Sequence, residues 1–443
     1  MDIAISNYKY FSDYPQDVSC PVPKPPREHA LAASRSTVHS PMFKPPPEII
    51  SRIIELGFED GEPDFPRLVS HVSGWLRDVA LGNPTFWATI TAVATKTSRE
   101  EILMRLERSK GVPLDITISG LYTRHDAEEV LDLLYPHVGR WRTLQADLRT
   151  TYAMEAFIQA LVDPAPLLQS VSLFGVSNAY GPVHIFGGNV PSLKSLSIRN
   201  ISLPWDSPLF HDLTSLQVHS STCTPSYMTQ WRNLQKLVIR VEPMQQLVLD
   251  LPTMSTVILP ELESLELNGV TEYDVTRLLS IVELPHLSRL LFTHVKSSRN
   301  SEFHAINALP ALRHLRLHTA EMSHENLLNL LARSRNLECI SFEDSSPMPS
   351  FITKLTPTQY PMTWLCPKLS SFHVLAFEKD NAPRFYSDND IANALRDMIY
   401  KRRVIRNVSA RMRLFNGYRN AKTRHAAPWG EDWPFISDES VVA

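Results

Sequence analysis

A six-residue pattern, with leucine first and apolar residues at its fourth and sixth positions, recurs nine times along the chain. The copies begin at Leu168, Leu193, Leu213, Leu234, Leu262, Leu287, Leu312, Leu337 and Leu369. Successive copies start 20 to 32 residues apart, and three consecutive steps measure 25. Side chains alternate along a strand, so the fourth and sixth positions share one face. One unit cannot bury that face alone, and the pattern therefore predicts a solenoid of stacked units.

The segments between the copies indicate how each unit turns back. Residues 272–283 and 323–334 carry apolar side chains at helical spacing, and Ser323 can cap the second helix. Apolar runs at 114–118 and 144–148 indicate degenerate first repeats. Six of the 34 prolines stand two residues before the first leucine of a copy, where they can end the return segment without removing a ladder hydrogen bond: Pro166, Pro191, Pro260, Pro285, Pro310 and Pro367.

The first 92 residues have a different character. Residues 1–42 contain six prolines and little apolar periodicity, which predicts a disordered tail. After three prolines at 45–47, four isoleucines follow at the spacing of one helix face. An acidic stretch at 59–66 then precedes a second series with helical spacing, and Gly82 with Pro84 marks its end. The isoleucines are Ile49, Ile50, Ile53 and Ile54, and the second series is Leu68, Val72, Trp75 and Val79.

Two strings in this region, PPEIISRII at 46–54 and LVSHVSGWLRDVALGNPTFWATI at 68–90, resemble an F-box. The resemblance implies a three-helix module that binds the adaptor subunit of a Skp-cullin-F-box ubiquitin ligase. It places the adaptor-binding residues at Pro46, Ile49, Ile50 and Ile53, and it gives Trp75, Arg77 and Trp87 a role in holding the module together. The sequence departs from the family pattern in having proline at 45, where leucine is usual, and Ser-Gly at 73–74, where Cys-Arg is usual.

The nine copies are similar to leucine-rich repeats, whose periods run from about 20 to 29 residues. Eight residues after the first leucine, the family usually has asparagine or cysteine; here Ile201, Val270 and Ala320 are examples of what replaces it. The combination resembles F-box proteins with divergent leucine-rich repeats, a kind expanded in fungi. We therefore expect an α/β fold: a short three-helix F-box followed by a solenoid of parallel strands with helical or irregular return segments.

These patterns divide the chain into five parts. They are a disordered proline-rich tail at 1–42, an F-box-like helical module at 43–92, linker helices with degenerate first repeats at 93–165, the solenoid at 166–400, and a basic then acidic tail at 401–443. Nine Lys or Arg and no acid lie between 401 and 424. That stretch fits an import signal or an RNA contact, but apolar residues at helical spacing favour a helix or capping element.

The outward positions of the copies predict a binding surface. The side chains at the third, fifth and seventh positions lie opposite the core, and more of them are basic than acidic. We expect a concave site for an acidic or phosphorylated protein segment, because guanidinium pairs well with phosphate. A merely solvated sheet is the alternative. The candidate residues are Lys236, Arg240, Arg289, His314, Arg316 and His318.

Signals for catalysis are weak. Glycine is scarce, with 14 residues, and no phosphate-loop, dinucleotide or zinc-protease motif occurs. The nearest nucleophile motif surrounds Ser177, but alanine stands where the closing glycine belongs. The 16 histidines and four cysteines lack metal-ligand spacing. We expect a non-enzyme without cofactor or metal; a hydrolase centred on Ser177 is a weaker alternative.

Charge and the N-terminal sequence bear on partners and location. The net charge of −3 gives no reason to expect nucleic acid, and no apolar run is long enough to span a membrane. The first residues lack the apolar core of a signal peptide, so we expect a cytoplasmic or nuclear protein. The predicted partners are a Skp-type adaptor with its cullin ligase core and an unidentified target protein. A repeat scaffold without ligase recruitment remains the alternative.

Overall fold

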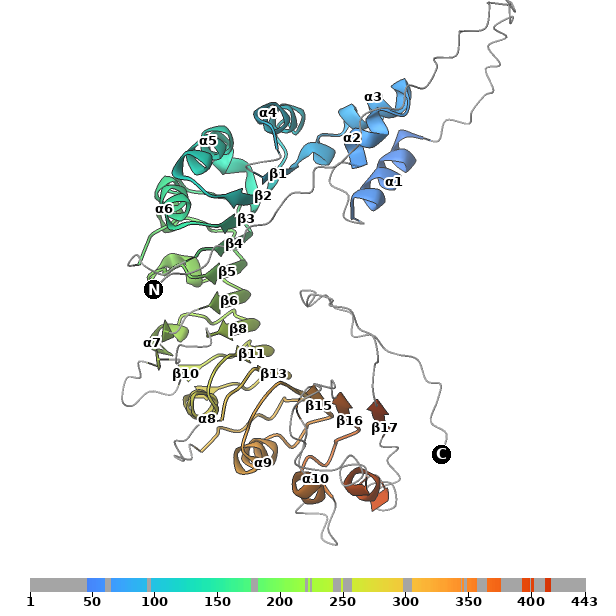
Figure 1. Cartoon of the computed structure of the whole chain (residues 1–443), viewed down its shortest axis with the longest axis vertical. Coiled ribbons are helices and arrows are strands. Elements are labelled where there is room, and N and C mark those ends of the chain that lie inside the picture. Colours follow the sequence, from blue (N-terminus) through green and yellow to red (C-terminus); the bar gives the residue numbers. More distant parts are fainter. Residues whose placement is uncertain are drawn as a thin grey trace, which may run out of the picture.

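The structure is a computed structural model. It describes residues 46–59, 65–93, 97–176, 182–219, 222–223, 225–241, 248–249, 257–297, 305–343, 345, 349–356, 365–375, 393–398, 400–401 and 411–415. The predicted tail at 1–42, Ser177 and most of the segment from 401 to 443 lie outside these residues. Figure 1 shows the described part as an arc, with strands lining its inner side and helices its outer side.

Three helices and a 3-10 turn form the N-terminal module: α1 (Pro47–Glu59), α2 (Phe65–Ser70), α3 (Gly74–Gly82) and η1 (Pro84–Trp87). The spacing of the apolar series from Leu68 to Val79 predicts one helix, but the structure divides it between α2 and α3. It breaks because Ser73 adopts an extended conformation and its hydroxyl accepts a hydrogen bond from the backbone N–H of Leu76 at 3.2 Å, capping α3. The break leaves Leu68 and Val72 exposed.

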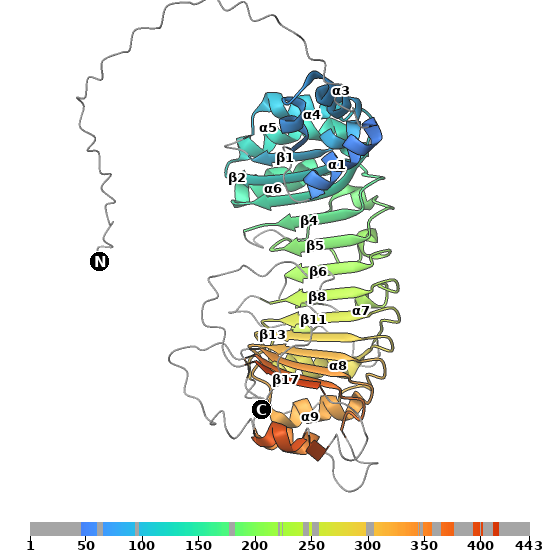
Figure 2. The same ribbon diagram turned by 90° about the vertical axis from the view of Figure 1, so that its right-hand side faces the viewer.

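Thirteen parallel strands form one sheet that follows the whole arc (Figure 2). In spatial order they are β1 (Thr89–Val93), β2 (Leu114–Leu121), β3 (Trp141–Leu148), β4 (Ser170–Phe174), β5 (Ser195–Arg199), β6 (Ser215–His219), β8 (Lys236–Arg240), β11 (Ser264–Asn268), β13 (Arg289–Thr293), β14 (His314–His318), β15 (Cys339–Glu343), β16 (Ser371–Leu375) and β17 (Arg411–Phe415). Two short pairs lie apart from it: β7 (Thr222–Cys223) with β9 (Val248–Leu249), and β10 (Val257–Ile258) with β12 (Val282–Glu283).

The α/β repeat fold predicted from the sequence is confirmed strand by strand. Each of the nine copies forms a strand that begins two residues after its first leucine. The fourth and sixth residues point into the core, as Leu196 and Ile198 do in β5. The runs at 114–118 and 144–148 lie in β2 and β3, so they are indeed early repeats of the same sheet. The sheet begins one strand earlier than the sequence indicates, at β1.

Helices cover the outer side at both ends of the arc, and irregular segments cover its middle. The elements are α4 (Arg99–Arg108), α5 (Arg124–Leu134), η2 (Tyr135–Arg140), α6 (Thr151–Ala160), η3 (Phe186–Gly188), η4 (Pro208–Phe210), α7 (Pro225–Met228), α8 (Glu272–Ile281), α9 (His324–Arg333) and α10 (Pro349–Leu355). The predicted helices at 272–283 and 323–334 correspond to α8 and α9, and Ser323 caps α9 by accepting from the N–H of Asn326.

The prolines before the copies sit in tight turns. The N–H of Leu168 donates to the carbonyl of Ala165, and that of Leu312 to the carbonyl of Leu309, so the intervening proline holds the second position of the turn. Its fixed φ suits this position, and its missing N–H is not needed there. Proline therefore sets the point at which each return segment ends.

Backbone hydrogen bonds take the place of an asparagine ladder after the strands. The N–H of Gly269 donates to the carbonyl of Thr293, and the N–H of His294 donates to that of His318, one strand further on. Left-handed backbone turns the chain at these positions, with φ of 75° at Gly269 and 51° at His294. From β3 to β17 the strands pair without any shift in register, although the repeats differ in length.

The two ends of the sheet differ from the predicted boundaries. The sequence predicts that the solenoid ends at 400 and that apolar spacing beyond it is helical, but β17 adds a parallel strand at 411–415. Strand formation there follows from the open edge of β16, whose backbone groups need partners. At the other end, the Thr97 hydroxyl donates to the carbonyl of Thr91 and accepts from the N–H of Val93. These two hydrogen bonds satisfy backbone groups on the open edge of β1.

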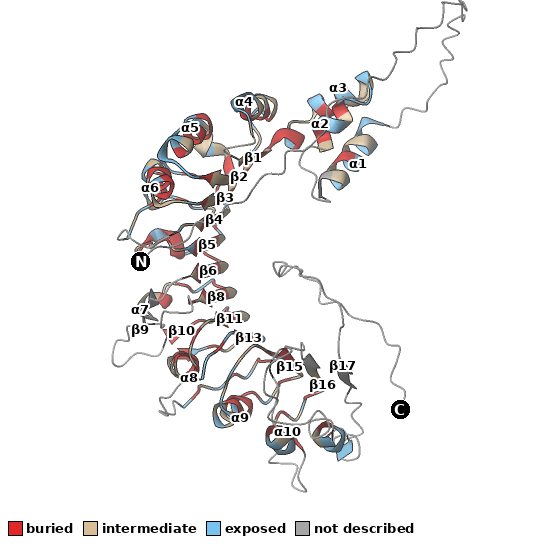
Figure 3. Ribbon diagram, viewed as in Figure 1, coloured by how far each residue is buried: buried red, intermediate tan, exposed pale blue. Residues whose placement is uncertain are grey.

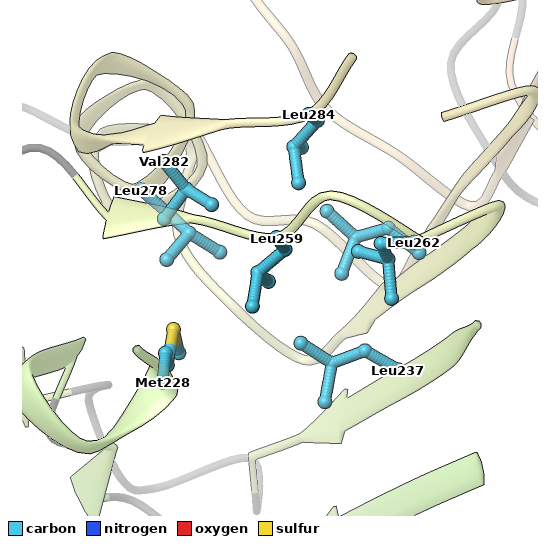
Figure 4. A pocket seen from close by; sticks show the side chains of 8 residues that line it. Met228, Leu237, Leu259, Leu262, Leu278, Val282 and Leu284 are labelled. Atoms are coloured by element: carbon cyan, nitrogen blue, oxygen red, sulfur yellow. The ribbon is translucent and has the colours of Figure 1, made fainter. Parts of the chain in front are cut away.

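A continuous apolar core fills the space between the sheet and the outer elements. Figure 3 shows buried residues in the strands and in the outer helices along the arc. One small cavity, about 10 Å³ in volume, interrupts it between α7, β8, β11 and α8. Its eight lining side chains are apolar, among them Met228, Leu237 and Leu278 (Figure 4). Since a buried water needs polar partners, this cavity is a dry packing gap. It is not a ligand site.

Candidate functional site

The first candidate surface is an apolar stripe on α1, which we define as Ile49, Ile53 and Leu56. These residues are spaced by four and three positions, so they share one helix face. Their side chains are 54%, 51% and 47% exposed, whereas Ile54 on the opposite face is buried. Of the four residues that the F-box resemblance assigns to adaptor binding, Pro46, Ile49 and Ile53 are exposed.

Two details of this surface differ from what the resemblance implies. Ile50 is half-buried and packs against the core of the module, so it supports the helix more than it offers a surface. Leu56 extends the apolar stripe, and its position seven residues after Ile49 is the sequence signal that identifies it. Leu68 and Val72 are also exposed at the end of α2 and just beyond it.

Trp87 holds the module together from its centre. It is fully buried with Ile54 and Phe86, and its indole Nε1–H donates to the carbonyl of Ala80 at 2.9 Å. Burial of a tryptophan with its N–H satisfied is strongly stabilising. Trp75 is only half-buried and Arg77 is exposed, so of the three residues implied to stabilise the module, Trp87 carries that role.

Helix α4 fastens the module to the solenoid. The Arg108 guanidinium lies over the Trp87 ring, and the Arg105 side chain, which is buried, donates from Nη1 to the carbonyl of Thr89 in β1 at 3.1 Å. Glu101 pairs with Arg105 at 3.5 Å and with Arg67 of α2 at 3.8 Å. Contacts from one helix to both parts fix the orientation of the apolar stripe relative to the sheet.

The second candidate surface is the concave face of the sheet, which carries three rows of side chains. They come from the third and fifth residues of each hexapeptide and from the residue that directly follows it, and we call them the amino-terminal, middle and carboxyl-terminal rows. Because the strands pair in register, each row runs straight across the sheet. All six predicted binding residues lie on this face: Lys236, Arg289 and His314 in the amino-terminal row, Arg316 in the middle row, and Arg240 and His318 in the carboxyl-terminal row.

Acids of the same sheet already engage three of these residues. Arg240 pairs with Glu266 on the next strand at 3.3 Å, and Arg316 makes a short ion pair with Glu343. The His318 ring nitrogen Nδ1 lies 3.5 Å from the same Glu343 carboxylate. Burial opposes ionisation of Glu343, but its contacts with His318 and Arg316 outweigh that effect and hold its pKa below the usual range.

Lys236 and Arg289 differ from the paired residues. Among the described residues, no ion pair or side-chain hydrogen bond engages either of them. Lys236 is half-buried and Arg289 is exposed. His314, beside Arg289, has its pKa lowered mainly by partial burial, with Arg289 adding to that effect against the opposing charge of Glu338. Among the six predicted binding residues, those that make no ion pair with a described residue therefore lie in the amino-terminal row.

The sequence places Glu266 and Glu343 on the concave face without showing that they neutralise its arginines. Their positions in the copies offer a signal, because each glutamate lies on the strand after its arginine and in the neighbouring row. Glu266 of the middle row lies beside Arg240, and Glu343 of the carboxyl-terminal row lies beside Arg316. Which side chains meet, however, depends on rotamers. Of the six basic residues predicted to bind a target, three thus contact acids of the sheet, and the other three make no ion pair among the described residues; the first set is Arg240, Arg316 and His318, and the second is Lys236, Arg289 and His314.

Chemical centres of other kinds find no support in the described residues. No group of three or more His, Cys, Asp or Glu side chains there could hold a metal ion. No helix in the described part of the chain is long and apolar enough to cross a membrane. Ser177, on which the hydrolase alternative depends, is not among the described residues.

Comparison with known proteins gives a limited result. No family model matches the sequence, and a search of curated proteins finds no match. Solved structures do match, among them a chain in the crystal structure of the Rad7 and Elc1 complex from yeast. That chain is 15% identical, the match covers 69% of this chain and 76% of the other, and the TM-score is 0.33. We draw no conclusion about function from a similarity this low.

Proposed function

We propose that this chain is the substrate-recognition subunit of a Skp-cullin-F-box ubiquitin ligase. The observation that carries the proposal is the apolar stripe on α1: three large apolar side chains are exposed together on one helix face, while Ile54 of the same helix packs against Trp87 in the core of the module. Exposed apolar clusters of this kind mark protein-binding surfaces. The F-box resemblance assigns the same face to a Skp-type adaptor, which in turn joins the cullin ligase core.

The concave face would bind the target protein. A parallel sheet curved around a polar surface offers many side chains to one extended partner, which is how repeat solenoids commonly bind proteins. In this role the chain positions its target and forms or breaks no bond itself. It would act in the cytoplasm or the nucleus, where cullin ligases work.

Recovery of the adaptor tests the proposal. The full chain, expressed with a Skp-type adaptor, should co-purify with it, and Ile49→Asp with Ile53→Asp should reduce recovery at least tenfold. Ile258→Asp is the matched control, because Ile258 is 51% exposed but lies on β10, away from the module. Circular dichroism should show that both variants keep the fold.

Two outcomes would contradict the proposal. Failure of the unaltered chain to recover adaptor would favour the alternative, a repeat scaffold without ligase recruitment. Equal recovery by the double variant and the Ile258 control would mean that the adaptor binds elsewhere.

A further inference from the structure

Two cations on the concave face lie on either side of a serine hydroxyl. Ser264 of β11 pairs in register with Lys236 of β8 and with Arg289 of β13, so the three residues are consecutive members of the amino-terminal row. Neighbouring strands are about 4.8 Å apart, which places the backbone of Lys236 about 10 Å from that of Arg289. Both side chains are long enough to converge above Ser264.

The surroundings leave the charge of these cations available. No acid occurs in the amino-terminal row from Ser215 of β6 to Cys339 of β15. Glu266 lies on β11 with Ser264, but its carboxylate pairs with Arg240 at the carboxyl end of β8. Among the described residues, no hydrogen bond engages the Ser264 hydroxyl. The row therefore presents two positive charges and one hydroxyl donor with no internal partner.

The paired residues nearby show what a single carboxylate does on this face. Glu266 is matched by the Arg240 guanidinium, and Glu343 by Arg316 with His318. Two unpaired cations call for more negative charge than one carboxylate supplies. A phosphoryl group carries about −1.5 to −2 charges at neutral pH and three strong acceptor oxygens, which matches two cations and a hydroxyl.

We infer that Lys236, Ser264 and Arg289 bind a phosphorylated side chain of a partner protein. The inference rests on the proposed function and names the chemistry of its target. Arg289 would pair with two phosphate oxygens, Lys236 would contact the third, and the Ser264 hydroxyl would donate between them. His314 at the next position of the row adds a hydrogen-bonding group.

Binding of peptides to the full chain tests this inference. The probes are three labelled libraries of one degenerate peptide, with phosphoserine, serine or glutamate fixed at the centre, measured by fluorescence anisotropy. We expect the phosphoserine library to bind at least about tenfold more tightly than the serine library, as charge-assisted contacts are lost without phosphate. Lys236→Gln with Arg289→Gln should remove that preference, and Ser264→Ala should weaken it by a few fold.

Matched controls separate a local effect from a general loss of charge or of fold. Arg333→Gln with Lys354→Gln removes two exposed positive charges from α9 and α10, on the outer side of the sheet, and should leave the preference unchanged. Thermal unfolding should show that both double variants fold. Equal binding of the phosphoserine and serine libraries, or an undiminished preference in the Lys236 and Arg289 variant, would overturn the inference.

Two further arms distinguish related explanations. If the glutamate library binds as tightly as the phosphoserine library, the row recognises acidic segments, and the assignment to phosphate is wrong. The chain with Ile49→Asp and Ile53→Asp should keep its full preference for phosphoserine. A preference for phosphoserine in an unaltered chain that fails to recover adaptor would support this site while contradicting the proposed ligase role.

Discussion

The guanidinium carbon of Arg108 lies 4.4 Å from the centre of the Trp87 ring. Arg108 ends α4, the first helix of the solenoid, and Trp87 is the central residue of the N-terminal module. A cation over an indole face is attracted by the ring quadrupole. The contact thus joins two parts of the chain that the sequence treats as separate units.

Arg108→Ala should therefore lower stability by about 0.5 to 2 kcal/mol, the range for cation–π contacts between exposed and desolvated sites. Thermal unfolding followed by tryptophan fluorescence measures this change. Arg99→Ala is the control, because Arg99 is an exposed arginine on the same helix. An equal effect of the two substitutions would show that the contact contributes nothing specific.

Gly269 is the residue of the backbone ladder least able to accept a side chain. Its φ is 75°, and a Cβ atom there would lie 2.2 Å from the carbonyl oxygen of Val241. Gly269→Ala should cost at least about 1 to 3 kcal/mol, from left-handed strain and a clash with rigid backbone. Gly111→Ala, where a Cβ meets nothing within 4 Å, should have little effect in the same chemical-denaturation experiment.

Glu272 connects α8 to α9 through a buried carboxylate, although the whole repeat that begins at Leu287 lies between these helices in the sequence. Its oxygen Oε1 accepts hydrogen bonds from the backbone N–H of Ser323 at 2.6 Å and from the side-chain amide of Asn326 at 2.8 Å. Glu272→Ala would remove the acceptor of these hydrogen bonds, and since hydrogen bonds to a charged group contribute about 1.5 to 3 kcal/mol, we expect a loss of that order. Exposed Glu283→Ala should be nearly neutral in equilibrium denaturation. Similar midpoints for both variants would contradict the structural role of Glu272.

His219 predicts a pH dependence of stability. Burial, with added repulsion from Arg240 and Arg199, lowers the pKa of His219 from 6.5 to about 4. Below pH 6.5 the His219 ring takes up a proton in the unfolded chain but stays neutral in the folded chain. This residue therefore reduces the free energy of unfolding as the pH falls from 6.5 toward 4. The slope from one proton is at most about 1.4 kcal/mol per pH unit, and it is smaller here because water screens the partly exposed ring.

His219→Gln should remove that part of the slope, measured as denaturation midpoints at a series of pH values in this window. The exposed His211→Gln serves as the control and should retain the slope of the unaltered chain. A His219 variant with an unchanged slope would mean that other groups cause the pH dependence.

Periodic apolar residues made the solenoid predictable, because burial imposes the same spacing on every repeat. The leucines that open each copy, such as Leu262 and Leu287, locate nine strands without error. The break at Ser73 was not predicted, since Leu68 and Val72 keep helical spacing although neither is buried. Helical spacing of apolar residues predicts one buried face only if the helix is continuous. A single capping hydroxyl, such as that of Ser73, can mark the start of a new helix and so interrupt that face.

The candidate site was predictable only in part for a different reason. Alternation along the strands places Arg316 and Glu343 on the concave face, but the two residues are 27 positions apart. Their pairing depends on the register of β14 with β15 and on side-chain rotamers, neither of which the sequence displays locally. Which cations stay unpaired, and so which can bind a partner, emerges only when the strands are placed side by side.

The in-register stacking of the strands also bears on how binding could change through evolution. Each side chain on the concave face has a position set by its strand and its place in the hexapeptide, as Lys236, Ser264 and Arg289 illustrate. Since buried apolar side chains and backbone hydrogen bonds hold the strands together, many outward residues can be replaced without moving the backbone. Positions without a partner among the described residues of the sheet, such as Lys236 and Arg289, can therefore change singly, so a new target can be acquired by few substitutions, whereas paired positions such as Arg316 and Glu343 must change together.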